Sequence, residues 1–183
     1  HLPDIISVLV YCAVSVDNTQ VKRGFVSALA TFGRVDDVTM KNAFDKHFIS
    51  KLSSTDFSLF AQELRTLSLV CENSGCVRHI SVDLLILLLG AISTTLIAVS
   101  HGRGYLDACE ICTKLIMSLS RRLRQEMESV SSSLVSSAKN VVHALASILS
   151  APQFNRDGIM SAGMSMAMLA SVLGAQEEAL PLT

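Results

Sequence analysis

The stretch from Leu84 to Ser100 constrains this chain most, because it contains no charged residue. Its apolar side chains occupy every side of a helix of about 3.6 residues per turn, so we expect the helix to be buried. A bilayer would also bury such a helix, but a membrane span needs about 20 predominantly apolar residues. Here Asp83 and His101 bound the stretch, and Ser93 interrupts it. We therefore expect residues 81–99 to form the central helix of a bundle, without insertion in a membrane.

Composition favours helices packed on helices. Half of the 183 residues are hydrophobic, 17% are charged, and the chain has no Trp, two Tyr and three Pro. Runs rich in Leu, Ala, Ser, Met and Val suit helices better than a sandwich of short strands. The length allows one compact domain. The sequence thus predicts an all-α fold: a single bundle of roughly six to eight helices over residues 1–175, followed by a loose C-terminal tail over residues 176–183.

Amphipathic helices are predicted before the apolar stretch. Asp4, Asn18 and Asp37 stand where N-cap residues are favoured. Gly33 stands where a residue in the left-handed conformation would end the second helix. Each helix carries apolar residues at intervals of three or four, the spacing of one buried face. In chain order the predicted faces are Ile5, Val8, Leu9 and Cys12; Val21, Phe25, Leu29 and Phe32; Met40, Phe44, Phe48 and Leu52; and Phe57, Phe60, Ala61, Leu64 and Leu67.

Further helices follow the apolar stretch. Apolar residues at intervals of four from Ile111 to Met127 predict a long helix that starts near Tyr105, and another stripe begins at Leu134. The segment SAPQFNRDG, residues 150–158, is typical of a loop, because Pro and Gly flank polar residues. The last predicted helix, IMSAGMSMAMLASVLG, alternates Met with small residues, which permits close packing against a flexible filler.

Two cysteines, Cys71 and Cys76, lie close together in the segment LVCENSGCVRH. Asn73 and Gly75 between them can reverse the chain and bring the two thiols together. This spacing predicts a disulfide across a turn. Five cysteines in total are too few for a disulfide scaffold and leave at least one thiol unpaired.

The second cysteine pair, Cys109 and Cys112, is one helical turn apart. A shared zinc or disulfide cluster with the first pair is disfavoured, because a helix over residues 81–99 would separate the pairs by about 28 Å. A redox pair is the functional alternative, but such motifs usually stand at a strand-to-helix junction. We expect two buried thiols here.

Catalytic, metal-binding and cofactor-binding patterns do not emerge from the sequence. The five histidines are far apart, and none belongs to a His-x-x-x-His pair. Neighbouring carboxylates such as Asp36 and Asp37 are better explained as helix caps than as an acid–base pair. No phosphate-binding loop, dinucleotide fingerprint or serine elbow is present. The sequence therefore predicts a protein that is not an enzyme and that uses neither a metal nor another cofactor.

Charge gives one candidate contact surface. The 15 basic and 16 acidic residues nearly cancel, which removes the electrostatic footprint of a nucleic-acid binder. Arg121, Arg122 and Arg124 form a candidate basic contact face, but Glu126 and Glu128 follow within two turns. An ordinary solvated helix face is the favoured alternative.

The segments LVCENSGCVRHISVDLLILLLGAIS and SSSLVSSAKNVVHALASILSAP resemble the helical ectodomain segment of polycystin-type receptors and the receptor-for-egg-jelly group. In those proteins, helices rich in Ser, Ala and Leu are interrupted by a close cysteine pair ahead of an apolar helix. The resemblance covers roughly residues 55–152. It implies an extracellular or secreted, disulfide-permissive setting and a role in adhesion or ligand-linked signalling.

The segment SSLVSSAKNVVHALASIL and the Met-rich last helix also resemble the helical terminal and repeat domains of spider silk. That likeness implies a bundle that dimerises during assembly. A third alternative is an intracellular helical interaction domain or a viral structural subunit with reduced thiols. From these observations we expect a structural or interaction module whose partner is another protein or a second copy of itself.

Overall fold

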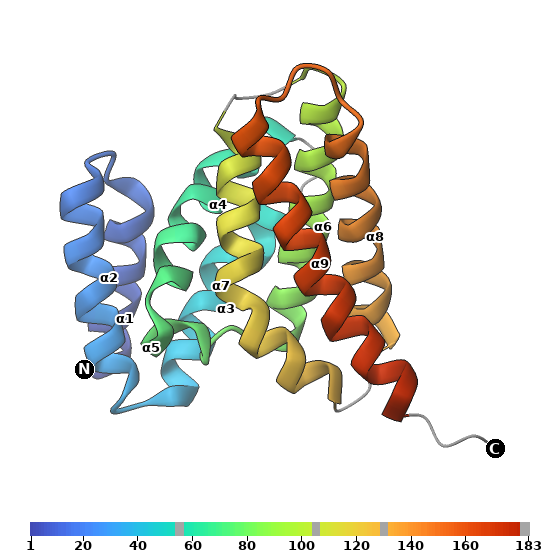
Figure 1. Ribbon diagram of the computed structural model, residues 1–183. Coiled ribbons are helices and arrows are strands. Elements are labelled where there is room, and N and C mark those ends of the chain that lie inside the picture. Colours follow the sequence, from blue (N-terminus) through green and yellow to red (C-terminus); the bar gives the residue numbers. More distant parts are fainter. Residues whose placement is uncertain (54–56, 104–106, 129–131, 180–183) are drawn as a thin grey trace. The chain divides into compact units, whose positions relative to one another are not determined.

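The computed structural model describes residues 1–53, 57–103, 107–128 and 132–179. Within these residues every regular element is a helix, which confirms the predicted all-α class (Figure 1). The helices of the described residues are α1 (Leu2–Ser15), α2 (Thr19–Gly33), α3 (Asp37–Leu52), α4 (Phe57–Glu72), α5 (Ser74–Val77), α6 (Val82–Ser100), α7 (Ala108–Glu128), α8 (Ser132–Leu149) and α9 (Arg156–Ala179).

The chain divides into two compact units, His1–Leu87 and Leu88–Thr183. The first unit contains α1 to α5, and the second contains α7 to α9. Because the boundary falls inside the continuous helix α6, one domain over residues 1–175 stays a prediction. The expected tail from residue 176 begins as helix, since α9 continues to Ala179, and residues 180–183 lie outside the described part.

In the first unit, α1 packs against α2 and α3, and the short α5 packs against α2 and α4. α2 begins as predicted at Asn18, whose side chain accepts hydrogen bonds from the backbone N–H groups of Gln20 and Val21 at 2.9 and 3.2 Å. The prediction that Asp37 caps α3 is wrong. Asp36 is the cap and accepts a hydrogen bond from the N–H of Thr39 at 2.9 Å.

The predicted buried faces of the first unit hold for some helices and fail for others. All four predicted residues of α3 are buried, and the rings of Phe44 and Phe48 meet edge to face with 6.1 Å between their centroids. In α4, Leu64 and Leu67 are buried, whereas the side chains of residues 57–61 lie outside the described part. In α2, Leu29 is buried as predicted.

The predicted face of α1 is wrong. Ile6 and Val10 are buried, whereas Ile5 and Val8 are 46% and 59% exposed. The sequence of this helix, LPDIISVLVYCAVS, is apolar on most sides, so its periodicity does not select one face. The same limit applies at the start of α2, where Val21 is 47% exposed.

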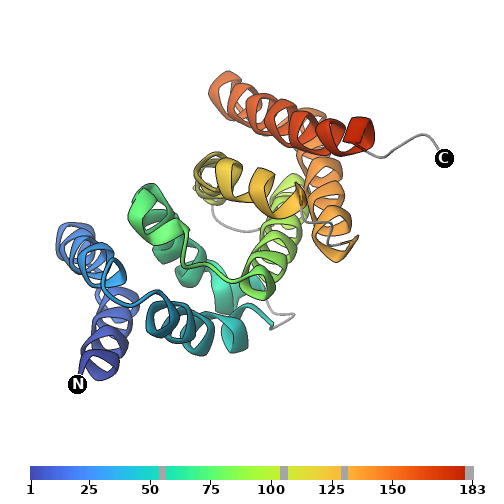
Figure 2. The ribbon, with the colours of Figure 1, turned by 90° about the horizontal axis from the view of Figure 1, so that it is seen from below.

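In the second unit, α9 lies against both α7 and α8 (Figures 1 and 2). The predicted stripes of α7 and α8 are confirmed. Their fully buried members include Leu115, Leu119, Leu123, Met127, Leu134, Ala138, Val141 and Leu145. Tyr105, the predicted start of the first of these helices, lies outside the described residues.

Helix α6 confirms the prediction of one long helix, but one side of it is open. Leu84, Leu88 and Ile92 are fully buried, whereas Ile97 is 44% exposed and Gly90 is exposed. We expected burial on every side, and that part is wrong. The helix ends at Ser100, and Gly102 follows it with a φ of 73°, the left-handed conformation that glycine permits.

Candidate functional site

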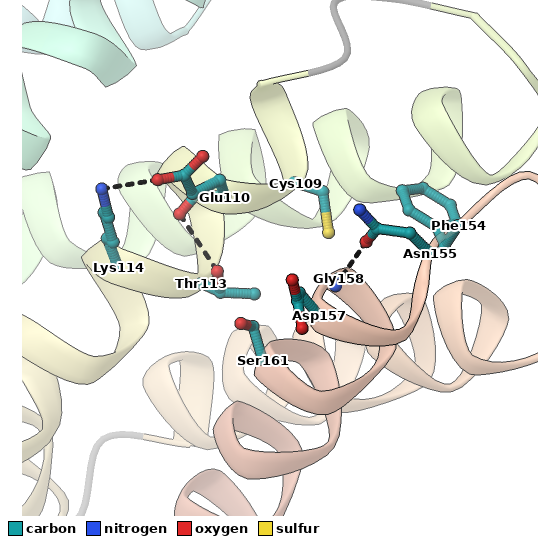
Figure 3. A pocket seen from close by; sticks show the side chains of 9 residues that line it. All are labelled: Cys109, Glu110, Thr113, Lys114, Phe154, Asn155, Asp157, Gly158 and Ser161. Atoms are coloured by element: carbon teal, nitrogen blue, oxygen red, sulfur yellow. Dashed lines mark hydrogen bonds and ion pairs between the residues drawn. The ribbon is translucent and has the colours of Figure 1, made fainter.

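The second unit contains a pocket of about 500 Å³ between the start of α7 and the start of α9 (Figure 3). Its volume lies within the usual range of small-molecule sites, about 300–1,000 Å³. The lining residues come from the first two turns of α7, the loop before α9 and the first two turns of α9. They are Cys109, Glu110, Thr113, Lys114, Phe154, Asn155, Asp157, Gly158 and Ser161.

The local sequence explains how α9 enters the pocket. Asn155 ends the loop and accepts a hydrogen bond from the N–H of Gly158 at 2.9 Å, which satisfies one free donor of the first helical turn. The helix therefore begins at Arg156, earlier than the predicted loop over residues 150–158 allowed. This start carries Asp157 and Ser161 into the pocket wall (Figure 3).

The polar groups of the α7 wall are partly engaged with one another. The ammonium group of Lys114 lies 2.7 Å from a carboxylate oxygen of Glu110, and the hydroxyl of Thr113 donates to the carbonyl of Glu110 at 3.0 Å. The Cys109 side chain is 4% exposed, and burial raises the pKa of its thiol. Because the thiolate is the nucleophile, Cys109 is an unreactive wall residue at neutral pH.

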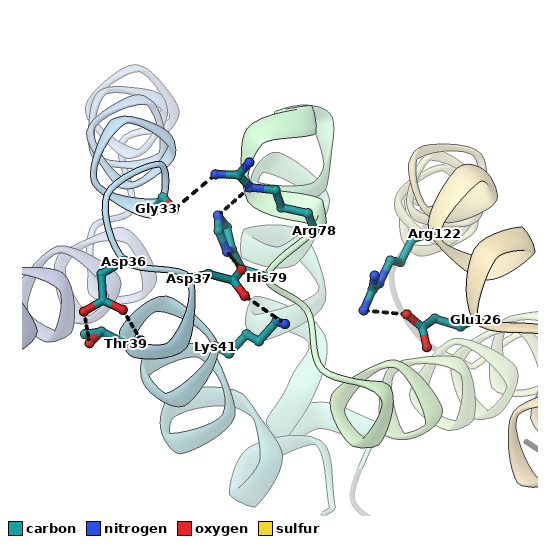
Figure 4. A network of polar contacts seen from close by, with 9 residues as sticks. All are labelled: Gly33, Asp36, Asp37, Thr39, Lys41, Arg78, His79, Arg122 and Glu126. Atoms are coloured by element: carbon teal, nitrogen blue, oxygen red, sulfur yellow. Dashed lines mark hydrogen bonds and ion pairs between the residues drawn. The ribbon is translucent and has the colours of Figure 1, made fainter. Parts of the chain in front are cut away.

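A buried histidine connects three segments of the first unit (Figure 4). The His79 ring is fully buried, and its Nδ1 lies 2.6 Å from Oδ1 of Asp37 at the start of α3. The Nε of Arg78 lies 3.1 Å from Nε2 of the ring, and Nη2 of Arg78 donates to the carbonyl of Gly33 at 3.2 Å. These bonds join the end of α2, the start of α3 and the segment between α5 and α6.

Gly33 provides room for this ring. A Cβ atom at residue 33 would lie 2.5 Å from Nε2 of His79, closer than real Cβ contacts allow. The prediction that Gly33 adopts a left-handed conformation is wrong, because Gly102 is the one glycine with positive φ among the described residues. The glycine is needed for close approach, the second common use of this residue.

The hydrogen-bond partners fix the state of His79. Arg78 can only donate, so Nε2 must accept and the proton of the neutral ring must lie on Nδ1, facing Asp37. Burial lowers the pKa of His79, against an opposing effect of Asp37. The hydrogen bond from Lys41 is the main cause that lowers the pKa of Asp37. A neutral ring and an ionised carboxylate are therefore the stable pair.

An aspartate that orients a histidine is also the arrangement of a general base. Here, however, the nitrogen that would accept a substrate proton is occupied by Arg78, and the ring is fully buried. General-base catalysis needs the base within hydrogen-bond reach of a substrate. The geometry of Asp37 and His79 supports a structural role.

A second buried polar contact joins α2 to α4. The ammonium group of Lys22 lies 3.0 Å from the hydroxyl of Thr66, and both side chains are buried. Burial lowers the pKa of Lys22, while Asp17 and Glu63 act in the opposite direction. Glu63 itself pairs with Lys51 of α3 at 2.9 Å.

The predicted disulfide between Cys71 and Cys76 is absent, because both residues are free thiols. Cys71 lies in the last turns of α4, whereas Cys76 lies in α5 with its sulfur 3.8 Å from the carbonyl oxygen of Val26. Burial raises the pKa of both thiols, that of Cys76 to about 12. Asn73 does turn the chain, as predicted, by accepting a hydrogen bond from the N–H of Gly75 at 3.0 Å.

The remaining predicted residues separate into buried thiols and an exposed face. Cys109 and Cys112 are buried, in agreement with the interpretation as core thiols. On α7, Arg121 and Arg124 are exposed, whereas Arg122 is half-buried and pairs with Glu126 at 2.7 Å (Figure 4). The candidate basic contact face stays a prediction. Among the described residues, no group of three or more His, Cys, Asp or Glu side chains could hold a metal ion.

Helix α9 is apolar in composition but little buried. Two helices of the described residues are long and apolar enough to cross a membrane, Val82–Ser100 and Arg156–Gly174. In the first helix 56% of the apolar segment is buried inside the protein, and in the second only 22% is buried. Met160 and Met164 of α9 are 56% and 57% exposed.

Sequence reasoning missed both polar sites. The pocket combines two segments about 40 residues apart in the chain, and neither carries a recognisable motif. The Asp37–His79 pair joins residues 42 positions apart, and Asp37 was assigned to a helix cap.

No protein-family model, curated protein or solved structure significantly matches this chain. The likenesses to polycystin-type ectodomains and to silk domains therefore stay predictions.

Proposed function

We propose that this chain is a non-catalytic helical interaction module, and that a second copy of the chain covers the outward face of α9. We define this α9 outer face by its exposed residues Met160, Met164, Ala167, Ser171 and Gly174. Their spacing of three or four residues places them in one stripe along the helix. The observation that carries the proposal is that only 22% of the apolar segment in Arg156–Gly174 is buried.

Charge supports a second copy as the partner. From Gly158 to Gln176 the chain has no charged residue, so a charged partner would lose hydration without gaining an ion pair. The α9 helix of a second copy also lacks charged residues over this range, so a contact between two copies would bury no charge. A two-fold symmetric pair brings the same patch of both copies together, and an antiparallel arrangement opposes the two helix dipoles favourably.

The residue types of the stripe suit helix-on-helix contact. Ala167, Ser171 and Gly174 are small, and small side chains at the contact allow helix axes to approach to about 8 Å. Met160 and Met164 are unbranched and flexible, so they can fill the irregular space that remains. These features also agree with the silk-like resemblance, which implies a dimer.

A membrane surface is the alternative occupant, and the sequence of α9 favours it less. Helices that lie in the membrane interface combine Lys or Arg on the polar face with Trp, Phe or Leu on the other. Between residues 158 and 176, α9 has no basic residue and no aromatic residue. Its exposed stripe has Met, Ala, Ser and Gly instead.

Light scattering coupled to size exclusion tests the proposal. We expect the wild-type chain to approach twice its mass of 19.7 kDa as concentration rises. Met164→Glu should remain a monomer, because it places a charge in the contact. Met117→Glu is the matched control, since Met117 is 43% exposed but lies on α7, and it should dimerise like the wild type.

Two results would overturn this proposal. The first is a wild-type chain that keeps its monomer mass up to about 1 mM, a concentration at which even weak specific contacts form. The second is equal dimerisation of the Met164→Glu variant. Sedimentation of the wild type, but not of this variant, with neutral phospholipid vesicles would assign α9 to a membrane surface instead.

The setting of the module is part of the same proposal. The polycystin-like resemblance implies an extracellular place and a role in adhesion or ligand-linked signalling, and the silk-like resemblance implies assembly. Mass measurements across about pH 5–8 separate these roles, because a silk-like domain should change its oligomeric state in the range where histidines titrate. An adhesion module should not.

A further inference from the structure

We propose that the pocket between α7 and α9 binds a small organic cation, with an alkylammonium group at Asp157 and its carbon chain against Cys109 and Phe154. This inference uses the pocket wall and is independent of the proposed dimer. Its basis is a cavity of about 500 Å³ whose lining includes two carboxylates and one ammonium group.

The charges of the pocket favour a cation. The pocket lining contains two carboxylates, those of Glu110 and Asp157, and one ammonium group, that of Lys114. Lys114 is already paired with Glu110 at 2.7 Å, and no cation pairs with Asp157 among the described residues. One negative charge in the wall is therefore uncompensated, and an ammonium group would form charge-assisted hydrogen bonds with it.

Two hydroxyl groups also line the pocket, those of Thr113 and Ser161. Figure 3 shows Ser161 one turn further along α9, on the same side of the pocket as Asp157, and Thr113 opposite on α7. The Thr113 hydroxyl donates its proton to the Glu110 carbonyl, so its oxygen has lone pairs left to accept. An ammonium group has three donors and no acceptor, which matches one carboxylate and two hydroxyl oxygens.

The remaining wall is suited to carbon atoms. Cys109 is 4% exposed, lines the pocket, and makes no hydrogen bond among the described residues. Figure 3 shows its sulfur pointing toward the start of α9. A buried thiol behaves as a small hydrophobic group, and the Phe154 ring continues this apolar side. A short alkyl chain would replace water there and bury apolar surface.

The first turn of α9 would otherwise suggest an anion, since free N–H groups there attract negative charge. In this chain Asn155 already accepts the bond from the N–H of Gly158, and Asp157 brings a negative charge of its own to the same turn. An incoming anion would meet that carboxylate. The anion is therefore the less favoured ligand and becomes an outcome of the test.

Amide NMR titrations of the full chain with butylammonium and with butyrate test the charge preference at equal ligand size. We expect butylammonium to shift the amide signals of Thr113, Gly158 and Ser161, and butyrate to leave them unchanged. Asp157→Asn should weaken butylammonium binding by about tenfold or more, because the neutral amide removes the charge-assisted hydrogen bond. Asp4→Asn is the matched control, since Asp4 also stands in the first turn of a helix but lies outside the lining of this pocket.

Three results would overturn the proposal. The first is the absence of amide shifts with butylammonium at about 50 mM, which is well above the millimolar range expected of so small a ligand. The others are equal shifts in the Asp157→Asn variant and shifts with butyrate at the same amides. Isothermal titration calorimetry with butylammonium gives an independent readout, and the Asp157→Asn variant should bind about tenfold more weakly than the wild type.

Discussion

The two units of this protein bury different kinds of side chain. In the first unit the buried polar residues include a lysine, a glutamate and a histidine, namely Lys22, Glu63 and His79. In the second unit the described buried polar residues carry only hydroxyl groups, as in Ser93, Thr95, Thr113 and Ser165. Buried charges need matched partners at fixed distances, whereas apolar stripes tolerate small shifts in helix position.

This difference teaches how each unit specifies its structure. In the first unit, directional hydrogen bonds from Arg78 and His79 fix the end of α2 and the start of α3. A small displacement of either side chain would break these bonds and lower the stability of the unit. The second unit depends on the continuous stripes of α7 and α8. It leaves the outer side of α9 exposed, where a second copy could add the missing contact.

The largest expected effect contrasts the two sides of the second unit. Leu119→Ala removes a fully buried side chain of α7 and should lower the free energy of unfolding by about 2–5 kcal/mol. Met164→Ala on the α9 outer face should change the free energy of unfolding of the monomer by less than about 0.5 kcal/mol. Urea unfolding at low concentration measures both values. Similar losses in the two variants would mean that α9 is covered within the monomer.

The next effect is a difference in stability between alanine substitutions at two glycines of α2, Gly33 and Gly24. Gly33→Ala should cost about 1–3 kcal/mol, because the added Cβ overlaps the ring of His79. Gly24→Ala is its control, since nothing lies within 4 Å of the added atom, and it should stabilise the protein by about 0.5–1 kcal/mol through helix propensity. If both substitutions stabilise, the close approach at Gly33 is not a constraint.

The contrast between these glycines shows what the sequence could and could not predict. Helix existence and the α3, α7 and α8 stripes follow from local spacing. The α1 face could not be predicted, because apolar residues surround most of that helix. The role of Gly33 could not be predicted either, since it depends on His79, which is 46 residues away and comes near only through tertiary packing.

The candidate sites were less predictable for the same reason. Cys71 and Cys76 are close in sequence, and that spacing led to a predicted disulfide, but the helix end and the start of α5 leave both as buried thiols. The pocket residues Cys109 and Asp157 belong to helices that are remote in the chain. No local pattern marks a wall that two helices form together.

A smaller effect concerns pH and the polar contacts of the first unit. Because burial lowers the pKa of His79 below its usual value of 6.5, the unfolded chain binds more protons than the folded chain as pH falls through that value. The stability that the neutral ring contributes is present above about pH 6.5 and is lost as pH falls toward the folded pKa. The slope for this one proton is at most about 1.4 kcal/mol per pH unit.

Urea unfolding of His79→Gln between about pH 7.5 and pH 5 checks this effect, and its slope should be shallower than that of the wild type. Burial also lowers the pKa of His47, so His47→Gln is the necessary comparison and should remove only its own part. Asp37, Lys41 and Arg78 are the charged groups next to the ring. An unchanged slope in His79→Gln would contradict the neutral, buried ring.

The smallest effect is one of reaction rate. In the native protein, iodoacetamide should modify Cys12 first, because it is partly exposed while the other four thiols are buried. After denaturation without a reductant, intact mass should show five added groups. Three groups would mean that one disulfide has formed, and peptide mapping of Cys71 and Cys76 would then restore the predicted turn disulfide.

Hydrogen–deuterium exchange of α9 at two protein concentrations tests the central claim most directly, because it reports on the exposed helix itself. We predict that the amides of residues 159–174 exchange more slowly at the higher concentration, while those of α3 in the first unit do not change. The Met164→Glu variant should lose this dependence. Exchange in α9 that is independent of concentration in the wild type would contradict the account.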